Sequence, residues 1–252
     1  MKNLFDLSGK TALITGSTSG MGKAIAEAMG LHGAKVIISS NDEVACQEVL
    51  QEFLTKGINV QAIPCDVSKK EEINNLVEKA NKIDILASCV GIGTVGSFLE
   101  TSTESFTKTM QINLQAAIYL TKRILPHMIA QKDGAIIYLA SIASVRGNKN
   151  LGLYGISKAG LAQLARNLAV EFGPQNIRAN VISPGMINTP FSESLIANNE
   201  FMEKRMALTP LRRVGTVEEI AGIAVMLASK AGGFITGQNI IVDGGTTISD
   251  GN

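Results

Sequence analysis

The 252 residues are 45% hydrophobic, enough to bury the core of one large α/β domain. The 23 basic and 22 acidic residues nearly cancel, and the chain has no Trp and no basic stripe, so we expect no nucleic-acid partner. No stretch approaches the roughly 18 apolar residues of a membrane span. We therefore expect a cytoplasmic protein that binds neither nucleic acid nor membrane.

Cysteine and histidine are too sparse to build a disulfide framework or a metal site. Cys46, Cys65 and Cys89 are odd in number, far apart and set among apolar or small residues, which indicates reduced, packed thiols. His32 and His127 are isolated from each other. We predict structural roles for both histidines and no bound metal.

Short β-branched runs alternate with longer helical stretches along the chain. The runs predict strands at residues 11–15, 35–39, 59–67, 83–91, 134–141, 177–185 and 238–245. The stretches between them predict helices at 22–33, 41–57, 69–82, 102–132, 154–173 and 216–229. Because the strands show almost no polar face, the pattern predicts a mostly parallel sheet covered by helices on both faces.

One segment interrupts this alternation. Residues 186–213 lie between the sixth predicted strand and the last predicted helix, and they are too long for an ordinary connection. Long loops of this kind often cover a site, so we expect a lid over a substrate here.

The first predicted strand runs directly into a glycine-rich turn, TGSTSGMG, at residues 15–22. Gly16, Gly20 and Gly22 would let the backbone turn tightly and approach a pyrophosphate at the helix N-terminus. The spacing Gly-x-x-x-Gly-x-Gly is wider than that of the ordinary dinucleotide fingerprint. Between a strand and a helix, this turn predicts nucleotide binding.

A second motif, YGISKAG at residues 154–160, places Tyr154 four residues before Lys158. On a helix these side chains share a face, at about 5–6 Å between their Cβ atoms. An ammonium beside a phenol lowers the phenol pKa from its ordinary value of about 10, which suits a general acid. A surface tyrosine beside a solvated lysine is the competing interpretation of the pair alone.

Taken together, the two motifs resemble the short-chain dehydrogenase/reductase family, and the resemblance covers essentially the whole chain. Five further segments match the family in the same order: CDV at 65–67, INL at 112–114, ASIAS at 140–144, SPGMINT at 183–189 and IIVDGG at 240–245. The resemblance implies a single-domain Rossmann fold over residues 1–252, with a doubly wound sheet of about seven strands. It also implies an NAD(P)-dependent enzyme.

Four residues form the catalytic set that this resemblance implies. Tyr154 would protonate the carbonyl oxygen in reduction, or accept the proton in oxidation, while Lys158 lowers its pKa and binds the nicotinamide ribose. Ser141 would donate to the substrate oxygen, unless it only caps a backbone group. Asn113 would hold a water that links Lys158 to solvent, unless it is an ordinary polar residue of a helix.

The resemblance also implies where the cofactor lies. The glycine-rich turn would hold the pyrophosphate, and the PGMINT segment would hold the nicotinamide carboxamide. Asp66 would contact adenine, although a cap on the following helix is nearly as good an interpretation. The complete cofactor set is Gly16, Ser17, Thr18, Ser19, Gly20, Met21, Gly22, Ser40, Asn41, Asp66, Val67, Ser88, Gly91, Asn113, Tyr154, Lys158, Pro184, Gly185, Ile187 and Thr189.

The sequence departs from the family pattern after the fourth strand. The family has Asn and Ala in the segment where this chain has Ser88 and Val90. A serine hydroxyl has fewer hydrogen-bonding groups than the asparagine amide. We expect a local packing change here and no loss of activity.

A second departure concerns the choice of cofactor. Members of the family that use NAD carry an acid at the end of the second strand, where this chain has Ser40 and Asn41. Asp42 follows, but we expect it to cap the next helix. Since Ser and Asn do not repel a 2′-phosphate, we predict NADP (NADPH) over NAD (NADH), with Lys23 as the nearest candidate cation.

The predicted function is the reversible reduction of a small-molecule ketone to a secondary alcohol by a nicotinamide cofactor. One alternative is a 3-oxoacyl-thioester reductase of fatty-acid synthesis, and another is a non-catalytic dinucleotide sensor on the same fold. For an acidic acyl carrier the lid offers few cations: Lys204, Arg205, Arg212 and Arg213. The resemblance further implies a homotetramer built from helices 102–132 and 154–173 and the last strand.

Overall fold

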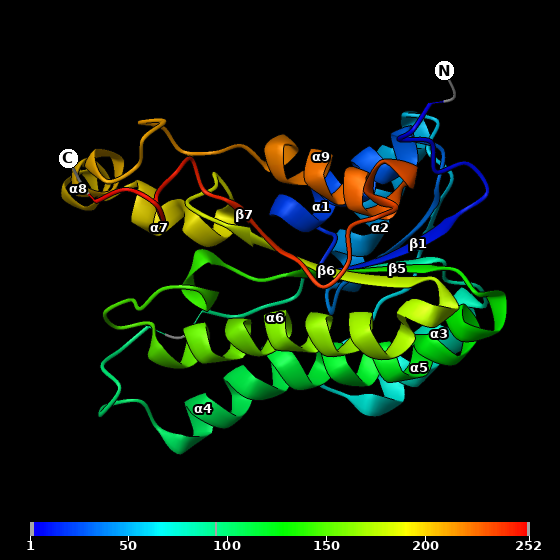
Figure 1. Cartoon of the computed structure of the whole chain (residues 1–252), viewed down its shortest axis with the longest axis horizontal. Helices are drawn as coiled ribbons and strands as arrows, with labels where there is room; N and C mark the ends of the chain where they lie inside the picture. Colours follow the sequence, from blue (N-terminus) through cyan, green and yellow to red (C-terminus); the bar gives the residue numbers. More distant parts are fainter. Residues whose placement is uncertain (1–2, 94, 251–252) are drawn as a thin grey trace.

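One parallel sheet runs through the middle of the molecule in the computed structural model, which describes residues 3–93 and 95–250 (Figure 1). Its strands lie in the order β3-β2-β1-β4-β5-β6-β7, and every neighbouring pair is parallel. They are β1 (Thr11–Thr15), β2 (Lys35–Ser39), β3 (Val60–Ala62), β4 (Ile85–Ser88), β5 (Gly134–Leu139), β6 (Ile177–Pro184) and β7 (Asn239–Val242). The order reverses direction at β1 and β4, so the predicted doubly wound Rossmann fold is confirmed.

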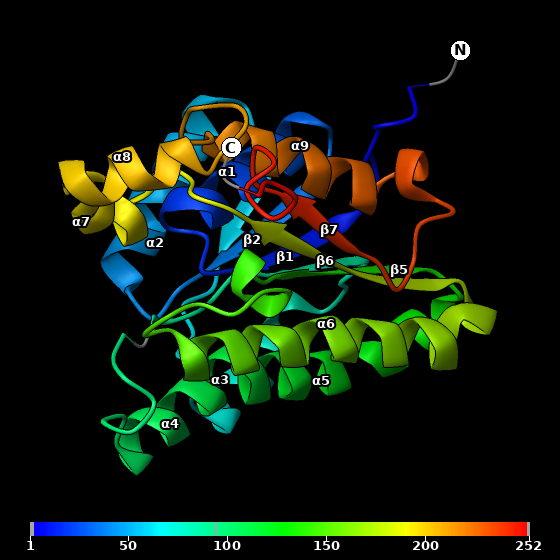
Figure 2. The same ribbon diagram turned by 60° about the vertical axis from the view of Figure 1, so that its left-hand side comes forward.

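Two helical layers cover the sheet, one on each face (Figures 1 and 2). The layers follow from the alternation of side chains along each strand. In β1, Ala12 and Ile14 pack into one core and Leu13 into the other. The first layer contains α1 (Gly20–Leu31), α2 (Glu43–Thr55) and α9 (Val217–Ala228), and the second contains α3 (Lys70–Ala80), α5 (Ala116–Gln131) and α6 (Gly152–Phe172).

The predicted helix at 102–132 is interrupted. The structure has α4 (Thr103–Met110), then a π-helical turn (Gln111–Gln115), then α5. The turn contains Asn113, whose side chain bonds backbone outside the helix. π-Helical turns within α-helices are frequent at functional sites.

The third strand is shorter than the predicted 59–67. Regular pairing with β2 ends at Ala62, although the amides of Ile63 and Cys65 still donate to Ile38 and Ser40. Pro64 lies between these two amides and has no N–H for a ladder. The segment therefore continues beside the end of β2 as a loop that leads to Asp66.

The predicted lid is largely helical. It contains a 3₁₀ turn (Pro190–Ser192), α7 (Glu193–Ile196) and α8 (Asn199–Ala207). Figure 1 shows α7 and α8 at one end of the molecule, beyond the two layers and beside the C-terminal segment. Further 3₁₀ turns occupy Ile142–Ser144, Gly173–Gln175 and Lys230–Gly232. Among the helices of the described residues, none is long and apolar enough to span a membrane.

Candidate active site

The glycine-rich turn between β1 and α1 forms a backbone cradle. Gly16 and Gly20 have φ values of +68° and +51°, a region that residues with a Cβ rarely adopt. Gly22 is required for a different reason, because a Cβ there would lie 2.1 Å from the carbonyl oxygen of Gly16. The turn can therefore pack against the start of α1. Its first amides, of Gly16 and Ser17, donate to Ser39 O, and the N-terminal amides of α1 have no side-chain cap and face the ligand position.

The cradle opens into a cavity of about 240 Å³ at the carboxyl end of the sheet. A second cavity of about 230 Å³ adjoins it and shares part of its wall. The shared residues are Gly16, Ser40, Val90 and Gly91. In an open α/β sheet, this position beside the reversal of strand order is where ligands bind.

Tyr154 and Lys158 both line the larger cavity, one turn apart on α6. Lys158 is 3% exposed, and its Nζ donates to the carbonyl oxygen of Leu139 at 3.0 Å. The ammonium lies 5.7 Å from the centroid of the Tyr154 ring. A Cβ at Gly91 would approach Nζ to 2.8 Å, so the chain needs glycine there to admit the lysine. The surface-pair interpretation is therefore wrong.

Burial controls the protonation of both groups. It raises the pKa of the Tyr154 phenol above its ordinary value, and the hydrogen bond with Ser141 only partly opposes this. Burial also lowers the pKa of the Lys158 ammonium to about 8. The predicted lowering of the Tyr154 pKa is thus wrong for the chain by itself, because loss of solvent outweighs the hydrogen bond with Ser141.

Ser141 connects the end of β5 to the Tyr154 phenol. Its Oγ accepts from the amide of Ala143 at 3.1 Å, so it caps the short 3₁₀ turn that follows. Its side chain is also hydrogen-bonded to Tyr154. The cap is therefore confirmed, and the bond with Tyr154 directs the hydroxyl toward the phenol. Donation to the substrate oxygen stays a prediction.

Asn113 joins three elements beside the cavity and does not line it. Its Oδ1 accepts from the amide of Ile92 at 2.8 Å, and its Nδ2 donates to Ile92 O and to Ser157 Oγ, each at 3.0 Å. Both amide hydrogens are thus engaged, and the residue is 1% exposed. The contacts show a positioning residue between the loop after β4 and α6. Its relay of a water stays a prediction.

Most of the predicted cofactor residues lie on the two cavities. The larger one is lined by Gly16, Thr18, Ser19, Gly20, Met21, Gly22, Ser40, Gly91, Tyr154, Lys158 and Thr189. The smaller one adds Asn41, Asp66 and Val67. Asp66 accepts from the amide and the hydroxyl of Ser68, at 3.0 and 2.7 Å, and the cap of α3 is Lys69. Asp66 therefore caps its own turn, not the helix, and remains open to the cavity.

Several other predicted cofactor residues pack next to the site without lining the two cavities. Ser17 is fully buried, and its Oγ accepts from the amide of Ser39 at 2.8 Å. The Ile187 side chain belongs to the core, and Ser88 is buried within β4. A Cβ at Gly185 would lie 2.8 Å from Asp243 Cα, which explains that glycine by packing. Together with Pro184, these side chains do not line the two cavities.

The choice between NAD and NADP depends on the region around Ser40. Asp42 accepts from the amide of Ala45 at 3.0 Å, so its predicted role as a helix cap is confirmed. Lys23 is bound to Glu52 at 2.6 Å. Because that carboxylate already neutralises it, Lys23 is a poorer partner for a 2′-phosphate than we predicted. Ser40 and Asn41 remain as neutral hydrogen-bonding groups at the cavity wall.

Sequence reasoning missed the apolar part of the cavity wall. These residues are Cys89, Val90, Leu139, Ala140, Pro190 and Phe191. Four of them, Cys89, Val90, Leu139 and Ala140, share a positional signal, because they lie at or directly after the end of β4 or β5. Phe191 belongs to the lid and remains 60% exposed. A Cβ at Gly93 would lie 3.0 Å from its ring, so the lid reaches the loop after β4.

The described residues include all three cysteines and both histidines. All three cysteines are free thiols. His32 Nδ1 contacts Ala28 O at 2.8 Å, and His127 Nε2 contacts the Gln131 amide at 2.7 Å, both within their own helical region. Within residues 3–93 and 95–250, no three His, Cys, Asp or Glu side chains are grouped as metal ligands.

These contacts fit a nicotinamide dinucleotide. The glycine-rich turn offers a backbone cradle for a pyrophosphate, and Ser40, Asn41 and Asp66 offer polar groups at the far end of the groove. The buried ammonium of Lys158 lies at the other end, beside Tyr154. The groove thus has the chemistry that a dinucleotide requires along its length.

Comparisons with known proteins agree with this geometry. A family model described as enoyl-(acyl carrier protein) reductase matches residues 16–247. A tropinone reductase homologue of Arabidopsis thaliana is 37% identical over 98% of this chain and 94% of its own. Dehydrogenase/reductase SDR family member 4 of Pongo abelii is 35% identical over 95% of this chain and 88% of its own.

Solved structures show the same fold. A gluconate 5-dehydrogenase from Burkholderia cenocepacia, in complex with NADP and tartrate, has a TM-score of 0.94 at 28% identity and covers 98% of both chains. A short-chain type dehydrogenase/reductase from Mycobacterium marinum has a TM-score of 0.91 at 33% identity, over 97% of this chain and 98% of its own. With the Tyr154–Lys158 pair, the glycine cradle and these matches, the chain belongs to the short-chain dehydrogenase/reductase family of oxidoreductases.

Proposed function

We propose that the protein reduces a ketone on a small molecule to a secondary alcohol, with NADPH as the hydride donor. The observation that carries the proposal is the convergence of Ser141, Tyr154 and Lys158 beside the glycine cradle. A protein that only senses a dinucleotide would not need a phenol at the cavity wall with a serine hydroxyl hydrogen-bonded behind it. The nicotinamide ring supplies the hydride when it is bound.

Ser141, Tyr154 and Lys158 position the substrate and transfer the proton. Ser141 donates a hydrogen bond to the carbonyl oxygen of the substrate and holds it near Tyr154. The phenol then gives its proton to that oxygen as negative charge develops there. Lys158 binds the nicotinamide ribose, and its positive charge stabilises the phenolate that remains.

Tyr154 acts in its protonated form in the reductive direction. Burial raises its pKa, so the phenol holds its proton at neutral pH. A protonated phenol is the form that acts as an acid on a developing alkoxide, whereas oxidation of an alcohol needs the phenolate.

NADP preference follows from the absence of a carboxylate at the end of β2. Ser40 and Asn41 would donate to the 2′-phosphate, and an acid at this place would repel it. The Burkholderia cenocepacia relative, solved with NADP, supports this choice. For the substrate, the names of relatives suggest ketones and hydroxyl compounds of small size, such as those of tropinone or gluconate enzymes.

The remaining parts of the proposal concern the lid, the assembly and the compartment. Residues 186–213 would close over the substrate, with Phe191 at the cavity wall. Exposed apolar residues near the last strand, Phe234, Ile241 and Ile248, support a homotetramer, because assembly would cover them. Three free thiols support a reducing compartment such as the cytoplasm.

Oxidation of NADPH in the presence of a panel of ketones tests the function. We expect substrate-dependent loss of absorbance with at least one small ketone, and a slower reaction with NADH at equal concentration. The absence of any ketone-dependent turnover, with cofactor binding intact, would favour the sensor. Turnover confined to 3-oxoacyl thioesters would favour the fatty-acid alternative.

A further inference from the structure

We propose that a ring of three hydrogen-bonded side chains holds the Ser141 hydroxyl against the Tyr154 phenol. This polar ring consists of Ser144, Ser183 and Asn239, and none of the three lines the two cofactor cavities. They are positioning residues, because they act on the reaction through Ser141. The proposal rests on the proposed function and adds to it residues outside its cavities.

The polar ring joins three elements that are far apart in the sequence. Ser144 ends the 3₁₀ turn after β5, Ser183 lies on β6, and Asn239 begins β7. Ser183 is fully buried, while the other two are half-buried. A buried hydroxyl costs free energy unless it is hydrogen-bonded, and the ring satisfies this one.

The hydrogen bonds of the polar ring run in one direction. Ser183 Oγ donates to Asn239 Oδ1 at 2.6 Å, and Asn239 Nδ2 donates to Ser144 Oγ at 3.2 Å. The Ser144 hydroxyl then donates to Ser183 Oγ, which lies 3.1 Å away, and closes the ring. Each hydroxyl therefore donates one hydrogen bond and accepts one, an arrangement in which each bond strengthens the next.

The polar ring is connected to Ser141 through the short 3₁₀ turn. The amide of Ser144 donates to the carbonyl oxygen of Ser141 at 2.8 Å, and the amide of Ala143 donates to Ser141 Oγ at 3.1 Å. On the other side of Ser141, the amide of Ala140 donates to Ile182 O of β6 at 2.8 Å. Ser141 is thus held between two attachments to β6, one through the backbone and one through the ring.

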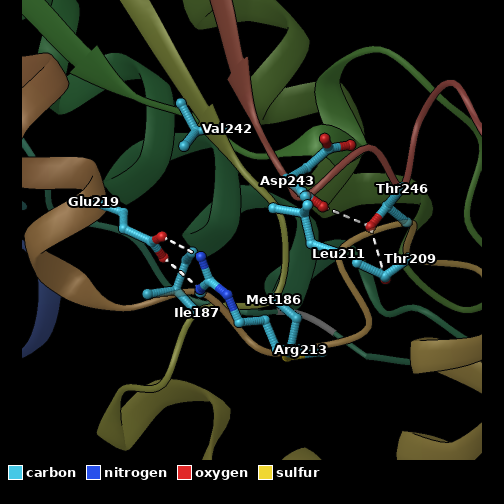
Figure 3. A pocket seen from close by; sticks show the side chains of 11 residues that line it. Met186, Ile187, Thr209, Leu211, Arg213, Glu219, Val242, Asp243 and Thr246 are labelled. Atoms are coloured by element: carbon cyan, nitrogen blue, oxygen red, sulfur yellow. Dashed lines mark hydrogen bonds and ion pairs between the residues drawn. The ribbon is translucent and has the colours of Figure 1, made fainter.

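The strand that carries Asn239 is fixed by contacts outside the ring. β7 pairs with β6 along its length, with Asn239 opposite Val181. Just beyond its far end, Thr246 Oγ1 donates to Asp243 O at 2.7 Å and contacts Thr209 Oγ1 at 3.0 Å, as Figure 3 shows. Asn239 is therefore a fixed point, and loss of the ring would loosen the Ser141 turn and leave the sheet in place.

A loosened turn would affect the chemistry because Ser141 must face the phenol. Its side chain is hydrogen-bonded to Tyr154, and in the proposed function it also donates to the carbonyl oxygen of the substrate. A misplacement of about 1 Å in a catalytic group can cost roughly 10² in rate. The polar ring would thus contribute to kcat without touching the substrate.

Variants that open the ring test this inference. Ser144→Ala and Ser183→Ala each remove one oxygen atom from it. In each, kcat for ketone reduction should fall by at least about fivefold, yet by less than the roughly 10²–10³ that loss of an electrostatic donor costs. The Kd for NADPH should not change. The double variant should lose no more than the larger single loss, because the ring opens only once.

The Ser141→Ala background separates positioning from general disruption. There, Ser144→Ala should lower kcat by less than about twofold more, since the group that it positions is gone. Gln238→Ala is the matched control for Asn239→Ala. It removes a carboxamide from the adjacent position, where the exposed side chain donates to Thr236 O at 3.0 Å, and it should leave kcat unchanged. Ser144→Thr keeps the hydroxyl and should retain most of kcat, because Ser144 lines a separate cavity of about 380 Å³ that can take the methyl group.

A spectroscopic measurement tests the ring without any turnover. The chain has three tyrosines, so ¹³C labelling at Cζ gives three NMR signals, and Tyr154→Phe identifies one of them. That signal should move in Ser141→Ala, which removes its hydrogen bond. Ser144→Ala should move it in the same direction, and Gln238→Ala should not move it. This result would support the ring even if no ketone were reduced, so it separates the ring from the proposed function.

Two results would overturn the inference. One is a Tyr154 signal that keeps its wild-type position in both Ser144→Ala and Ser183→Ala, whether or not ketones are reduced. The other is kinetic: a kcat that these variants leave unchanged, or that they lower equally with and without Ser141.

Discussion

Ser40 stands at the wall of both cavities, where its hydroxyl accepts from the amide of Asp42 at 3.3 Å. A carboxylate here would repel a 2′-phosphate and accept from the ribose hydroxyls of NAD. Ser40→Asp should therefore move the ratio of kcat/KM values toward NAD by at least about tenfold, or ~1.4 kcal/mol. The measurement compares both cofactors with one ketone, in wild type and variant.

Gln47→Glu provides the control, since it adds the same charge on the exposed face of α2, outside both cavities. It should not change the cofactor ratio. A wild type that already prefers NAD would contradict the NADP proposal. An unchanged ratio in Ser40→Asp would place the ribose elsewhere.

At the residue scale, the sequence identified side chains better than it identified their environments. Tyr154 and Lys158 could be paired by spacing alone, because a helix brings positions i and i+4 together. The direction in which the Tyr154 pKa shifts could not be predicted from spacing, because the shift depends on burial by segments far away in the chain. For the same reason, the pairing of Lys23 with Glu52 on another helix was not predictable from local spacing.

At the scale of elements, the start of α1 carries the cofactor cradle. A Cβ at Gly22 would overlap the Gly16 carbonyl oxygen, so Gly22→Ala must shift the turn or the helix. We expect a loss of about 1–3 kcal/mol in the free energy of unfolding, with a weaker affinity for NADP. Chemical denaturation and cofactor titration would measure the two effects.

Gly222→Ala is the matched control for this change. Gly222 lies within α9, and a Cβ there would meet nothing within 4 Å. The alanine should raise stability by about 0.5–1 kcal/mol through helix propensity, with no effect on the cofactor. If Gly22→Ala behaved like this control, the cradle would not depend on close approach of the backbone.

Element types could be predicted well, and their ends less well. Each strand was found because apolar β-branched runs between turn residues have few alternatives. The long helix over 102–132 looked continuous, since its π-helical turn is fixed by the contacts of Asn113 with Ile92 and Ser157. Those contacts join segments distant in sequence. The short helices of the lid lacked an apolar period long enough to detect.

On the scale of the whole molecule, the site exists because parallel strands end at one edge of the sheet. The glycine turn follows β1, Ser40 follows β2, Gly91 follows β4 and Ser141 follows β5. The sequence order of these segments gives no distances, but the topology brings them to two adjoining cavities. The apolar wall emerges only from this assembly.

The central claim is that Tyr154 gives the proton that completes reduction of the ketone. Tyr154→Phe removes the phenol oxygen and keeps the ring, so it tests this role with little change in packing. Tyr119→Phe is the control, because Tyr119 lies on α5 and bonds Asn74 at 3.1 Å, away from both cavities.

The decisive measurement is kcat for ketone reduction by Tyr154→Phe, together with the Kd for NADPH. The account predicts that kcat falls by roughly 10²–10⁴, the usual span for general acid–base catalysis, with Kd nearly unchanged and Tyr119→Phe close to wild type. Retention of more than about a tenth of wild-type kcat, well outside that span, would contradict the acid role of Tyr154.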